Sequence, residues 1–367
     1  MGRLRPPVWV VRPAVRVRNL VGRLHRQAVP PALTVLEQMD RMIEVRLVAA
    51  VIEVGLVDAF ASGPRTASDA ALAAGTDADA TFRVLRYLAS KGWFAVRAGG
   101  VTPLARFELS PTGSLLRADH PAGLRDWARF AGAPWVATIW NHAGESLRTG
   151  SSATRVATGR EFFDYLADEP DAERLFDAAM ASGSGLQADL LAASYDTSAY
   201  RSICDVGGGT GTALAAVLER NPGATGVLLE RPSVVERARV ELEGRAVALR
   251  IDLVAGDMFE SVPESCDLYQ LLAIVHDWAD EPARQILANV AARLGRDGRA
   301  LVVEAVAPDR AEPDFSLMSD VLMLVLTGSG RERTLAQFHA LFAGAGLRVT
   351  RDIVLPNLFH AFELAPA

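Results

Sequence analysis

The chain has 367 residues, 50% hydrophobic and 22% charged, which is typical of a globular protein of two or three domains. Its 38 basic and 44 acidic residues leave a net charge of −6, which gives no electrostatic reason to expect a nucleic-acid partner. The longest apolar run is interrupted by Arg46 and Glu53, so no integral membrane association is predicted. Cys204 and Cys266 lack the spacing of a zinc site or a disulfide framework and favour a reducing, cytoplasmic setting.

Residues 1–30 form a basic N-terminal arm. Seven arginines precede the first acidic residue, Glu37, among valines and leucines. Membrane-surface and targeting segments share this pattern. However, Pro6, Pro7 and Pro13 are expected to interrupt a continuous amphipathic helix. We therefore predict a flexible or partner-packing arm.

Residues 31–115 are predicted to form a winged-helix-like domain. Two helices joined at residues 75–79, with Thr66 and Asp77 as caps, precede a hairpin that turns at Gly99–Gly100. Three acidic and three basic residues cancel within this helix-turn-helix, whereas a helix that reads DNA is strongly basic. The sequence therefore favours a packing or dimerisation module over a DNA-binding one.

The remaining sequence divides near residue 195. Residues 116–195 are predicted to be a helical connecting and substrate-pocket region. Its many aromatic side chains either line a pocket or fill the hydrophobic core between helices, and their spacing alone favours a place in the core. Over residues 196–367, short apolar strands alternate with helices, which is typical of a doubly wound parallel sheet. The predicted fold class is α/β, with a C-terminal Rossmann-like domain and an N-terminal, mostly α-helical winged-helix domain.

The segment "DVGGGTG", residues 205–211, lies between a predicted strand and a predicted helix. Gly207, Gly209 and Gly211 allow a tight turn and a close approach of the backbone to a ligand at the helix N-terminus. The dinucleotide fingerprint requires glycine or alanine where this chain has Thr212, which disfavours NAD.

Two acidic residues follow the next two predicted strands. Glu230 stands at the distance where a carboxylate binds ribose hydroxyls, and Asp257 closes the third strand in the same way. Met258 and Phe259 add apolar and aromatic surface for a flat base. Together these groups predict a nucleoside-bearing ligand, and because no P-loop lysine is present, S-adenosylmethionine fits better than ATP.

Several segments in a fixed order carry a family resemblance: "GREFFDYLADEP", "LFDAAM", "DVGGGTG", "GDMF", "HDWADE", "VVEAV" and "GRERT". With them, the sequence resembles the small-molecule O-methyltransferases of the plant caffeate and flavonoid type and their bacterial relatives that methylate aromatic polyketides. The resemblance runs over most of the chain. It implies a homodimer that transfers a methyl group from S-adenosylmethionine to a hydroxyl of a small aromatic acceptor, without a metal.

The resemblance assigns the general base to His276 and its two flanking acids to Glu304 and Glu332. Full proton transfer from a phenol, pKa about 10, to an ordinary imidazole, pKa about 6.5, costs roughly 5 kcal/mol. Transfer during formation of the new bond, with a carboxylate orienting the imidazole, avoids much of that cost. The resemblance implies that Gly207, Glu230, Asp257 and Met258 hold the cofactor. With the rest of the glycine loop and the strand ends, the predicted cofactor residues are Asp205, Gly207, Gly209, Gly211, Glu230, Asp257, Met258 and Phe259. Those implied for the acceptor are Phe162, Met180, Asp320 and Met323.

Two positions depart from the plant pattern. Leu272 replaces a cofactor-contacting lysine, and Thr327 replaces a common asparagine, so the acceptor is not expected to be a plant phenylpropanoid. Two other functions stay open. One is hydroxylation or decarboxylation of a polyketide on the same fold, which the intact base and acids disfavour. The other is a winged-helix regulator that senses the cofactor, which the neutral helix-turn-helix disfavours.

Overall fold

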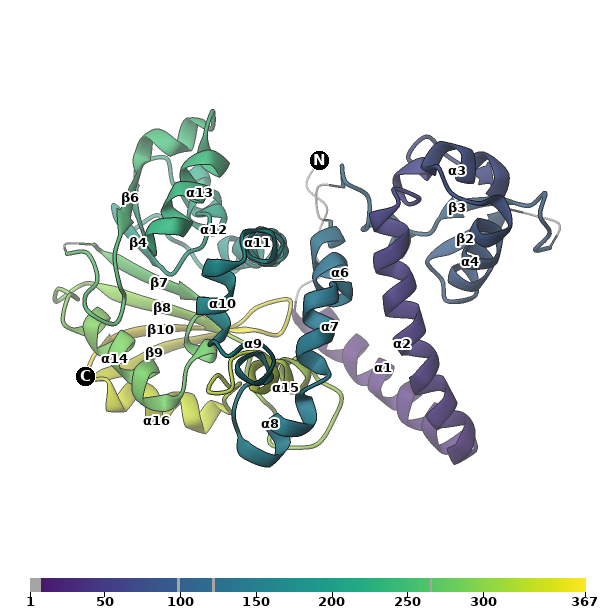
Figure 1. Cartoon of the computed structure of the whole chain (residues 1–367). Coiled ribbons are helices and arrows are strands. Elements are labelled where there is room, and N and C mark those ends of the chain that lie inside the picture. Colours follow the sequence, from purple (N-terminus) through teal and green to yellow (C-terminus); the bar gives the residue numbers. More distant parts are fainter. Residues whose placement is uncertain (1–7, 98–99, 121–122, 265) are drawn as a thin grey trace. The chain divides into compact units, whose positions relative to one another are not determined.

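The computed structural model describes residues 8–97, 100–120, 123–264 and 266–367. The chain divides into two compact units, each built from separate stretches of sequence (Figure 1). The first unit holds the residues up to Arg23, Ile139–Pro170 and Ser184–Ala367. The second unit holds Leu24–Thr138 and Asp171–Gly183.

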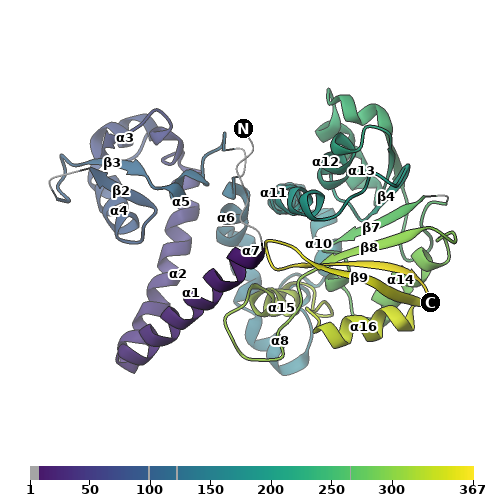
Figure 2. The ribbon, with the colours of Figure 1, turned by 180° about the vertical axis from the view of Figure 1, so that it is seen from behind.

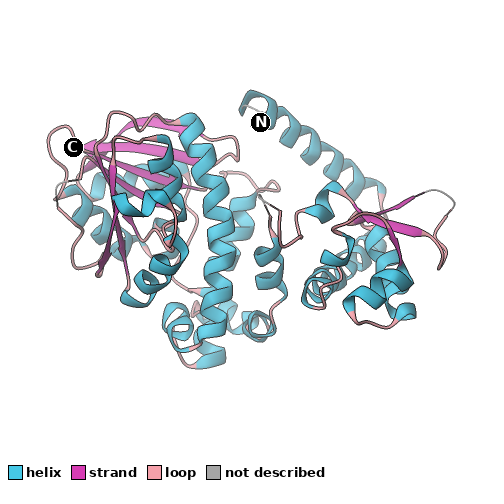
Figure 3. Cartoon of the chain, turned by 90° about the horizontal axis from the view of Figure 1, so that it is seen from above, coloured by secondary structure: helices cyan, strands magenta, loops and turns pink. Residues whose placement is uncertain are grey.

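A seven-stranded sheet forms the centre of the first unit (Figures 1 and 3). Its strands are β4 (Ser202–Val206), β5 (Thr225–Glu230), β6 (Ile251–Ala255), β7 (Leu268–Leu272), β8 (Arg299–Glu304), β9 (Leu347–Val354) and β10 (His360–Pro366). They lie in the order β6-β5-β4-β7-β8-β10-β9, and the first five are mutually parallel. β10 is antiparallel to both of its neighbours, β8 and β9. A short loop joins it to β9 in a hairpin (Figure 2). The predicted α/β class is confirmed, with a mixed rather than purely parallel sheet.

Helices cover both faces of this sheet because its strands are apolar on both faces. On one face the core contains residues of α11 (Pro170–Ser194), α12 (Thr212–Arg220) and α13 (Pro232–Leu242). On the other face it contains residues of α14 (Asp280–Ala291) and α16 (Leu335–Gly344). This unit also contains α8 (Ala143–Thr149), α9 (Ala153–Thr158), α10 (Phe162–Asp168), α15 (Phe315–Leu326), the short helices η2 (Ala246–Arg250) and η3 (Val275–Asp277), and parts of two further helices described below.

The strand order creates a switch point between β4 and β7. From β4 the chain winds outward through β5 to β6, then returns to β7 on the other side of β4 and continues to β8. The loops that follow β4 and β7 therefore lie beside each other at the carboxyl ends of the strands, where open α/β sheets bind ligands.

The second unit contains the predicted helix-turn-helix and hairpin. Thr66 accepts a hydrogen bond from the amide of Asp69 at the start of α3, and Asp77 accepts one from Ala80 at the start of α4, so both predicted caps are confirmed. The elements are α2 (Pro31–Glu53), η1 (Asp58–Phe60), β1 (Arg65–Thr66), α3 (Ala67–Ala74), α4 (Ala78–Ser90), β2 (Phe94–Arg97), β3 (Arg106–Leu109), α5 (Pro111–Ser114) and α6 (Arg125–Gly132), and α7 (Pro134–Trp140) begins in this unit. The three strands pair in the order β1-β3-β2. Part of the predicted hairpin turn lies outside the described residues.

The N-terminal arm differs from the prediction. Residues Val8–Ala28 form a continuous helix, α1, that runs through Pro13. Pro13 lies in the second turn, so its missing N–H costs only one helical hydrogen bond, to the carbonyl of Trp9, and the surrounding turn is exposed to water. Pro6 and Pro7 lie outside the described residues. Among the described helices none is long and apolar enough to cross a membrane.

Candidate active site

The glycine loop connects β4 to α12 and depends on glycine at each position. Gly207, Gly209 and Gly211 have φ angles of 71°, 59° and 77°, in the left-handed region that other residues rarely adopt. Gly208 has no such angle, but a Cβ there would lie 2.3 Å from a carboxylate oxygen of Asp205. The loop is therefore bare backbone over the sheet, next to the N-terminus of α12.

Asp205 lies beneath this loop. It is only 1% exposed, and neither carboxylate oxygen has a hydrogen-bond partner among the described residues. Burial raises the pKa of Asp205 to about 7, and the nearby charge of Glu230 adds to the increase. Its position supports the loop from below, and direct contact with a cofactor stays a prediction.

Glu230 ends β5 and reaches the glycine loop. One carboxylate oxygen accepts a hydrogen bond from the amide of Gly209 at 3.0 Å, and the other accepts one from the amide of Arg231 at 2.8 Å. Asp257 follows β6 and is exposed, and it accepts a hydrogen bond from the amide of Phe259 at 2.8 Å. The structure thus brings Glu230 to the loop, whereas Asp257 is bound within its own turn.

Three aromatic rings connect this region to the turn that follows β7. Trp278 meets Phe259 edge to face, with centroids 4.7 Å apart, and stacks on Phe163 at 5.7 Å. Phe162, the first residue of α10, is buried and packs edge to face on Phe163 at 5.3 Å. Met258 is half-buried and is held through its carbonyl by Asn289. Phe259 and Phe162 therefore belong to one aromatic cluster beside the histidine turn.

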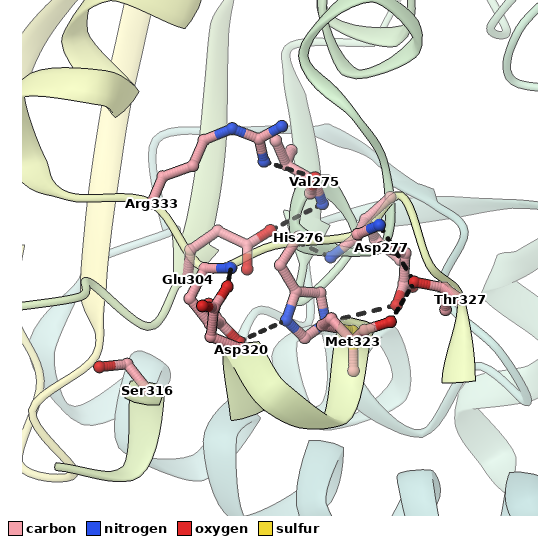
Figure 4. A network of polar contacts seen from close by, with 12 residues as sticks. Val275, His276, Asp277, Glu304, Ser316, Asp320, Met323, Thr327 and Arg333 are labelled. Atoms are coloured by element: carbon pink, nitrogen blue, oxygen red, sulfur yellow. Dashed lines mark hydrogen bonds and ion pairs between the residues drawn. The ribbon is translucent and has the colours of Figure 1, made fainter. Parts of the chain in front are cut away.

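His276 lies on η3 and is held by carboxylates (Figure 4). Its Nδ1 lies 2.8 Å from a carboxylate oxygen of Glu332, and its side chain is 16% exposed. Glu304, at the end of β8, is fully buried and accepts hydrogen bonds from the amides of Ile274 at 3.1 Å and Val275 at 2.7 Å. Ring nitrogen and carboxylate oxygens of His276, Glu304 and Glu332 all lie within 4.8 Å of one another. The structure thus brings together the three residues predicted to act in catalysis.

The charges of this cluster shift the pKa values of its members. Burial lowers the pKa of His276, but Glu304, Asp277 and Glu332 outweigh it and raise the pKa to about 10. Burial raises the pKa of Glu304 to about 7 and that of Asp277 to about 6, despite the opposing charge of His276. The surrounding carboxylates therefore favour the protonated form of the imidazole.

The predicted acceptor residues separate into two groups. Asp320 and Met323 lie on α15, where Asp320 accepts a hydrogen bond from the amide of Glu332 at 2.9 Å and Met323 is buried (Figure 4). Asp320 thereby contacts the segment that holds His276. Met180 belongs to the second compact unit, so its role at the acceptor stays a prediction.

Two features of the site were missed from the sequence. Ala273, between β7 and η3, has a φ of 55°, which is rare for a residue with a side chain. Arg333 is almost completely buried behind the turn that carries His276. No sequence signal marks Ala273, whereas Arg333 stands within the "GRERT" segment, where only Glu332 was assigned a role. Leu272, in place of the plant lysine, is 8% exposed and belongs to the apolar core.

Comparison with known proteins shows which family the chain belongs to. The family model for the O-methyltransferase domain matches residues 140–348. The mitomycin biosynthesis 6-O-methyltransferase of Streptomyces lavendulae is 38% identical over 84% of this chain and 86% of its own length. The 8-amino-8-demethylriboflavin N,N-dimethyltransferase of Streptomyces davaonensis is 35% identical over 82% of this chain and 85% of its own length.

A solved structure agrees in fold. It is that of NcsB1, an O-methyltransferase from neocarzinostatin biosynthesis, in complex with S-adenosylmethionine and 2-hydroxy-5-methyl naphthoic acid. It has a TM-score of 0.71 and 32% sequence identity, and the match covers 88% of this chain and 96% of that one. The chain therefore belongs to the family of enzymes defined by the O-methyltransferase domain.

Proposed function

We propose that this protein is an S-adenosylmethionine-dependent O-methyltransferase that methylates a hydroxyl group of a small aromatic molecule, with His276 as the general base. Family membership supports methyl transfer to a small natural product. The naphthoic acid bound to NcsB1 supports an aromatic acceptor with a ring hydroxyl. The main support for His276 as the base is the 2.8 Å distance between its Nδ1 and a carboxylate oxygen of Glu332.

The residues at the switch point fit S-adenosylmethionine. The glycine loop leaves room for the cofactor where a Cβ would intrude, and Glu230 offers a carboxylate to ribose hydroxyls at the end of β5. Phe259 and Met258 provide apolar surface for the adenine ring. S-adenosylmethionine supplies a methyl group on a sulfonium cation, a strong electrophile that requires mainly alignment with the acceptor oxygen.

Two properties of His276 support its role as the base. Glu332 holds Nδ1, and Nε2 lies 3.7 Å from the carboxylate of Asp277, beyond hydrogen-bond distance, so Nε2 is available to a substrate hydroxyl. The raised pKa of His276 brings it closer to the pKa of a phenol, about 10, so proton transfer to this imidazole costs less than transfer to an ordinary one. Positive charge placed beside the imidazole lowers its pKa, so binding of a cationic cofactor favours the unprotonated base.

The test combines turnover with a separate binding measurement. Labelled S-adenosylmethionine is incubated with a panel of phenols, naphthols and hydroxyanthraquinones, using wild type, His276→Ala and the control His339→Ala, whose imidazole is exposed on α16. We expect His276→Ala to lose at least 100-fold in turnover, the order contributed by a general base. Its calorimetric affinity for the cofactor should be retained. Normal turnover by His276→Ala would refute the assignment of the base.

Methylation of an aromatic amine is a second candidate function. The riboflavin-related relative that is 35% identical carries the name of an N,N-dimethyltransferase. A neutral aromatic amine attacks the methyl group without prior loss of a proton, so its methylation depends less on a base. Including anilines in the panel separates the two: amine acceptors should keep most of their turnover in His276→Ala, whereas hydroxyl acceptors should lose it.

We further propose that the enzyme works as a homodimer in the cytoplasm, where its two buried cysteines stay reduced. The dimer is supported by α2, which exposes a series of large apolar side chains. These are Leu33, Val35, Leu36, Met39, Met42 and Ile43, each more than half exposed. Leu36→Glu should convert the protein to a monomer in light scattering, whereas the control Leu72→Glu, an isolated exposed leucine on α3, should not. Equal masses for both variants would refute this interface.

A further inference from the structure

Arg333 is held in a fixed place behind the histidine turn. It directly follows Glu332 and is 1% exposed. Its backbone carbonyl accepts a hydrogen bond from the amide of Ala307 at 2.9 Å, and it pairs with Val306 in an isolated β-bridge just beyond β8. Backbone contacts thus fix Arg333 to the segment that follows Glu304.

The guanidinium group of Arg333 bonds to the backbone on both sides of His276. Figure 4 shows its contact with Val275. Nη1 donates to the carbonyl of Val275 at 2.9 Å, and Nη2 donates to the carbonyl of Trp278 at 2.8 Å. Nε and Nη2 also donate to one carboxylate oxygen of Asp280, at 3.0 and 2.9 Å. One planar group therefore bridges the residues before and after the histidine and the first residue of α14.

We propose that Arg333 is a positioning residue for the methyl-transfer reaction, because it fixes the turn that presents His276 to the acceptor. The inference rests on the proposed role of His276 as the base. Two adjacent residues have complementary roles, because Glu332 holds the imidazole ring and Arg333 holds the backbone that carries it.

The conformation of the turn explains why such a contact is needed. Ala273, two residues before η3, adopts a left-handed φ of 55°, and strained backbone persists only where its surroundings hold it. Arg333 fastens the turn on the C-terminal side of this residue. A lysine keeps the positive charge but lacks the planar fork, so it cannot reach both carbonyls and the carboxylate of Asp280 together.

The experiment compares Arg333→Lys with Arg250→Lys. Arg250 is a matched control because its guanidinium likewise bonds backbone carbonyls, those of Leu218, Asn221 and Ala224, at the opposite, amino-terminal end of the strands. With the best acceptor of the panel, we expect kcat of Arg333→Lys to fall at least tenfold, about 1.4 kcal/mol of activation free energy. Its KM and calorimetric affinity for S-adenosylmethionine should stay within twofold, and Arg250→Lys should keep kcat within twofold.

A spectroscopic measurement separates positioning from a general loss of stability. In ¹⁵N-histidine spectra the hydrogen bond to Glu332 gives the ring nitrogen of His276 a distinct resonance, identified by its absence in His276→Ala. This resonance should shift in Arg333→Lys and stay unchanged in Arg250→Lys. If Arg333→Lys does not fold, Asp280→Asn weakens the same contact from a half-exposed partner, and a shift of the same resonance is expected.

Two results would overturn the inference: kcat of Arg333→Lys within twofold of wild type, or an unchanged resonance of His276. Failure of the proposed function looks different. In that case wild type transfers no methyl group to any member of the panel, while the resonance of His276 still responds to Arg333→Lys.

Discussion

Replacing Glu304 by glutamine tests the electrostatics of the active site most directly. Glutamine has the same shape and keeps a carbonyl oxygen to accept the hydrogen bonds from the amides of Ile274 and Val275. The substitution therefore removes a negative charge with little change in packing. Because the charge of Glu304 is the largest single contribution that raises the pKa of His276, the variant should have a lower histidine pKa.

The size of the change follows from the distance between the two groups. Their polar atoms lie within 4.8 Å, and at an effective dielectric constant of about 20 two unit charges at that distance interact by about 3.5 kcal/mol. This energy corresponds to a pKa difference of about 2.5. Glu304, with a pKa of about 7, is ionised where His276 titrates near pH 10, so the full interaction applies. We expect the pKa of His276 to fall to between 7 and 8 on this scale.

The assay is an NMR titration of the His276 imidazole in wild type and Glu304→Gln, with exposed His339 as the internal reference in the same spectra. A kinetic titration accompanies it. The protonated imidazole is inactive as a base, so kcat/KM rises with pH up to the pKa of the free enzyme. The acid limb should therefore move to lower pH in the variant. An unmoved midpoint for His276, with a folded variant, would refute the assignment of its high pKa to Glu304.

Three further predictions concern the cofactor loop and the strained turn. Glu230→Gln should weaken the affinity for S-adenosylmethionine, measured by calorimetry, about tenfold, since a hydrogen bond to a charged acceptor contributes about 1.5–3 kcal/mol. Unchanged affinity would refute a role for Glu230 in binding the cofactor. Because the pKa of Asp205 is raised on folding from 3.8 to about 7, its stabilising contribution is full below pH 3.8 and is lost as pH rises through 7. Asp205→Asn should therefore raise the free energy of unfolding at pH 8 by up to about 4 kcal/mol and leave it nearly unchanged at pH 3.5, and equal effects at both values would contradict this. Ala273→Gly should raise the free energy of unfolding by about 1 kcal/mol, because glycine adopts the left-handed φ without strain. The control Ala288→Gly, in the exposed part of α14, should lower it by a similar amount. A lower free energy of unfolding in both variants would show that Ala273 is unstrained.

The strands of the sheet and the position of the glycine loop were predictable from local signals. Strand-like runs that end in glycine or acid predict where the carboxyl ends of the strands lie, and the structure places Glu230 and the glycine loop there. The contact between His276 and Glu332 required the family resemblance, because 56 residues separate them and no spacing rule connects them.

Properties that depend on the folded surroundings were not predictable. The ordinary imidazole pKa of about 6.5 assumed from sequence differs from the pKa of about 10 for His276, because Glu304 and Glu332, from two distant segments, join the neighbouring Asp277 around it. The burial of Arg333 and the φ of Ala273 are likewise results of tertiary packing. Pro13 was expected to interrupt the helix, but it lies inside α1, because the loss of one backbone hydrogen bond near the start of an exposed helix costs little. The division into domains at residues 30, 115 and 195 stays a prediction.

The interleaving of the two compact units constrains how the chain can be made and altered. The second unit takes its final stretch, Asp171–Gly183, from the N-terminal half of the single helix α11, whose remainder belongs to the first unit. During synthesis, therefore, the second unit cannot be completed until the ribosome has released residue 183, and the first must wait for the C-terminal hairpin of β9 and β10. A single cut between residues 24 and 183 divides both units, and a cut after residue 183 leaves the second unit whole but still divides the first. Exchange of substrate specificity between relatives by simple recombination at a linker is accordingly disfavoured, and point substitution is the more accessible route.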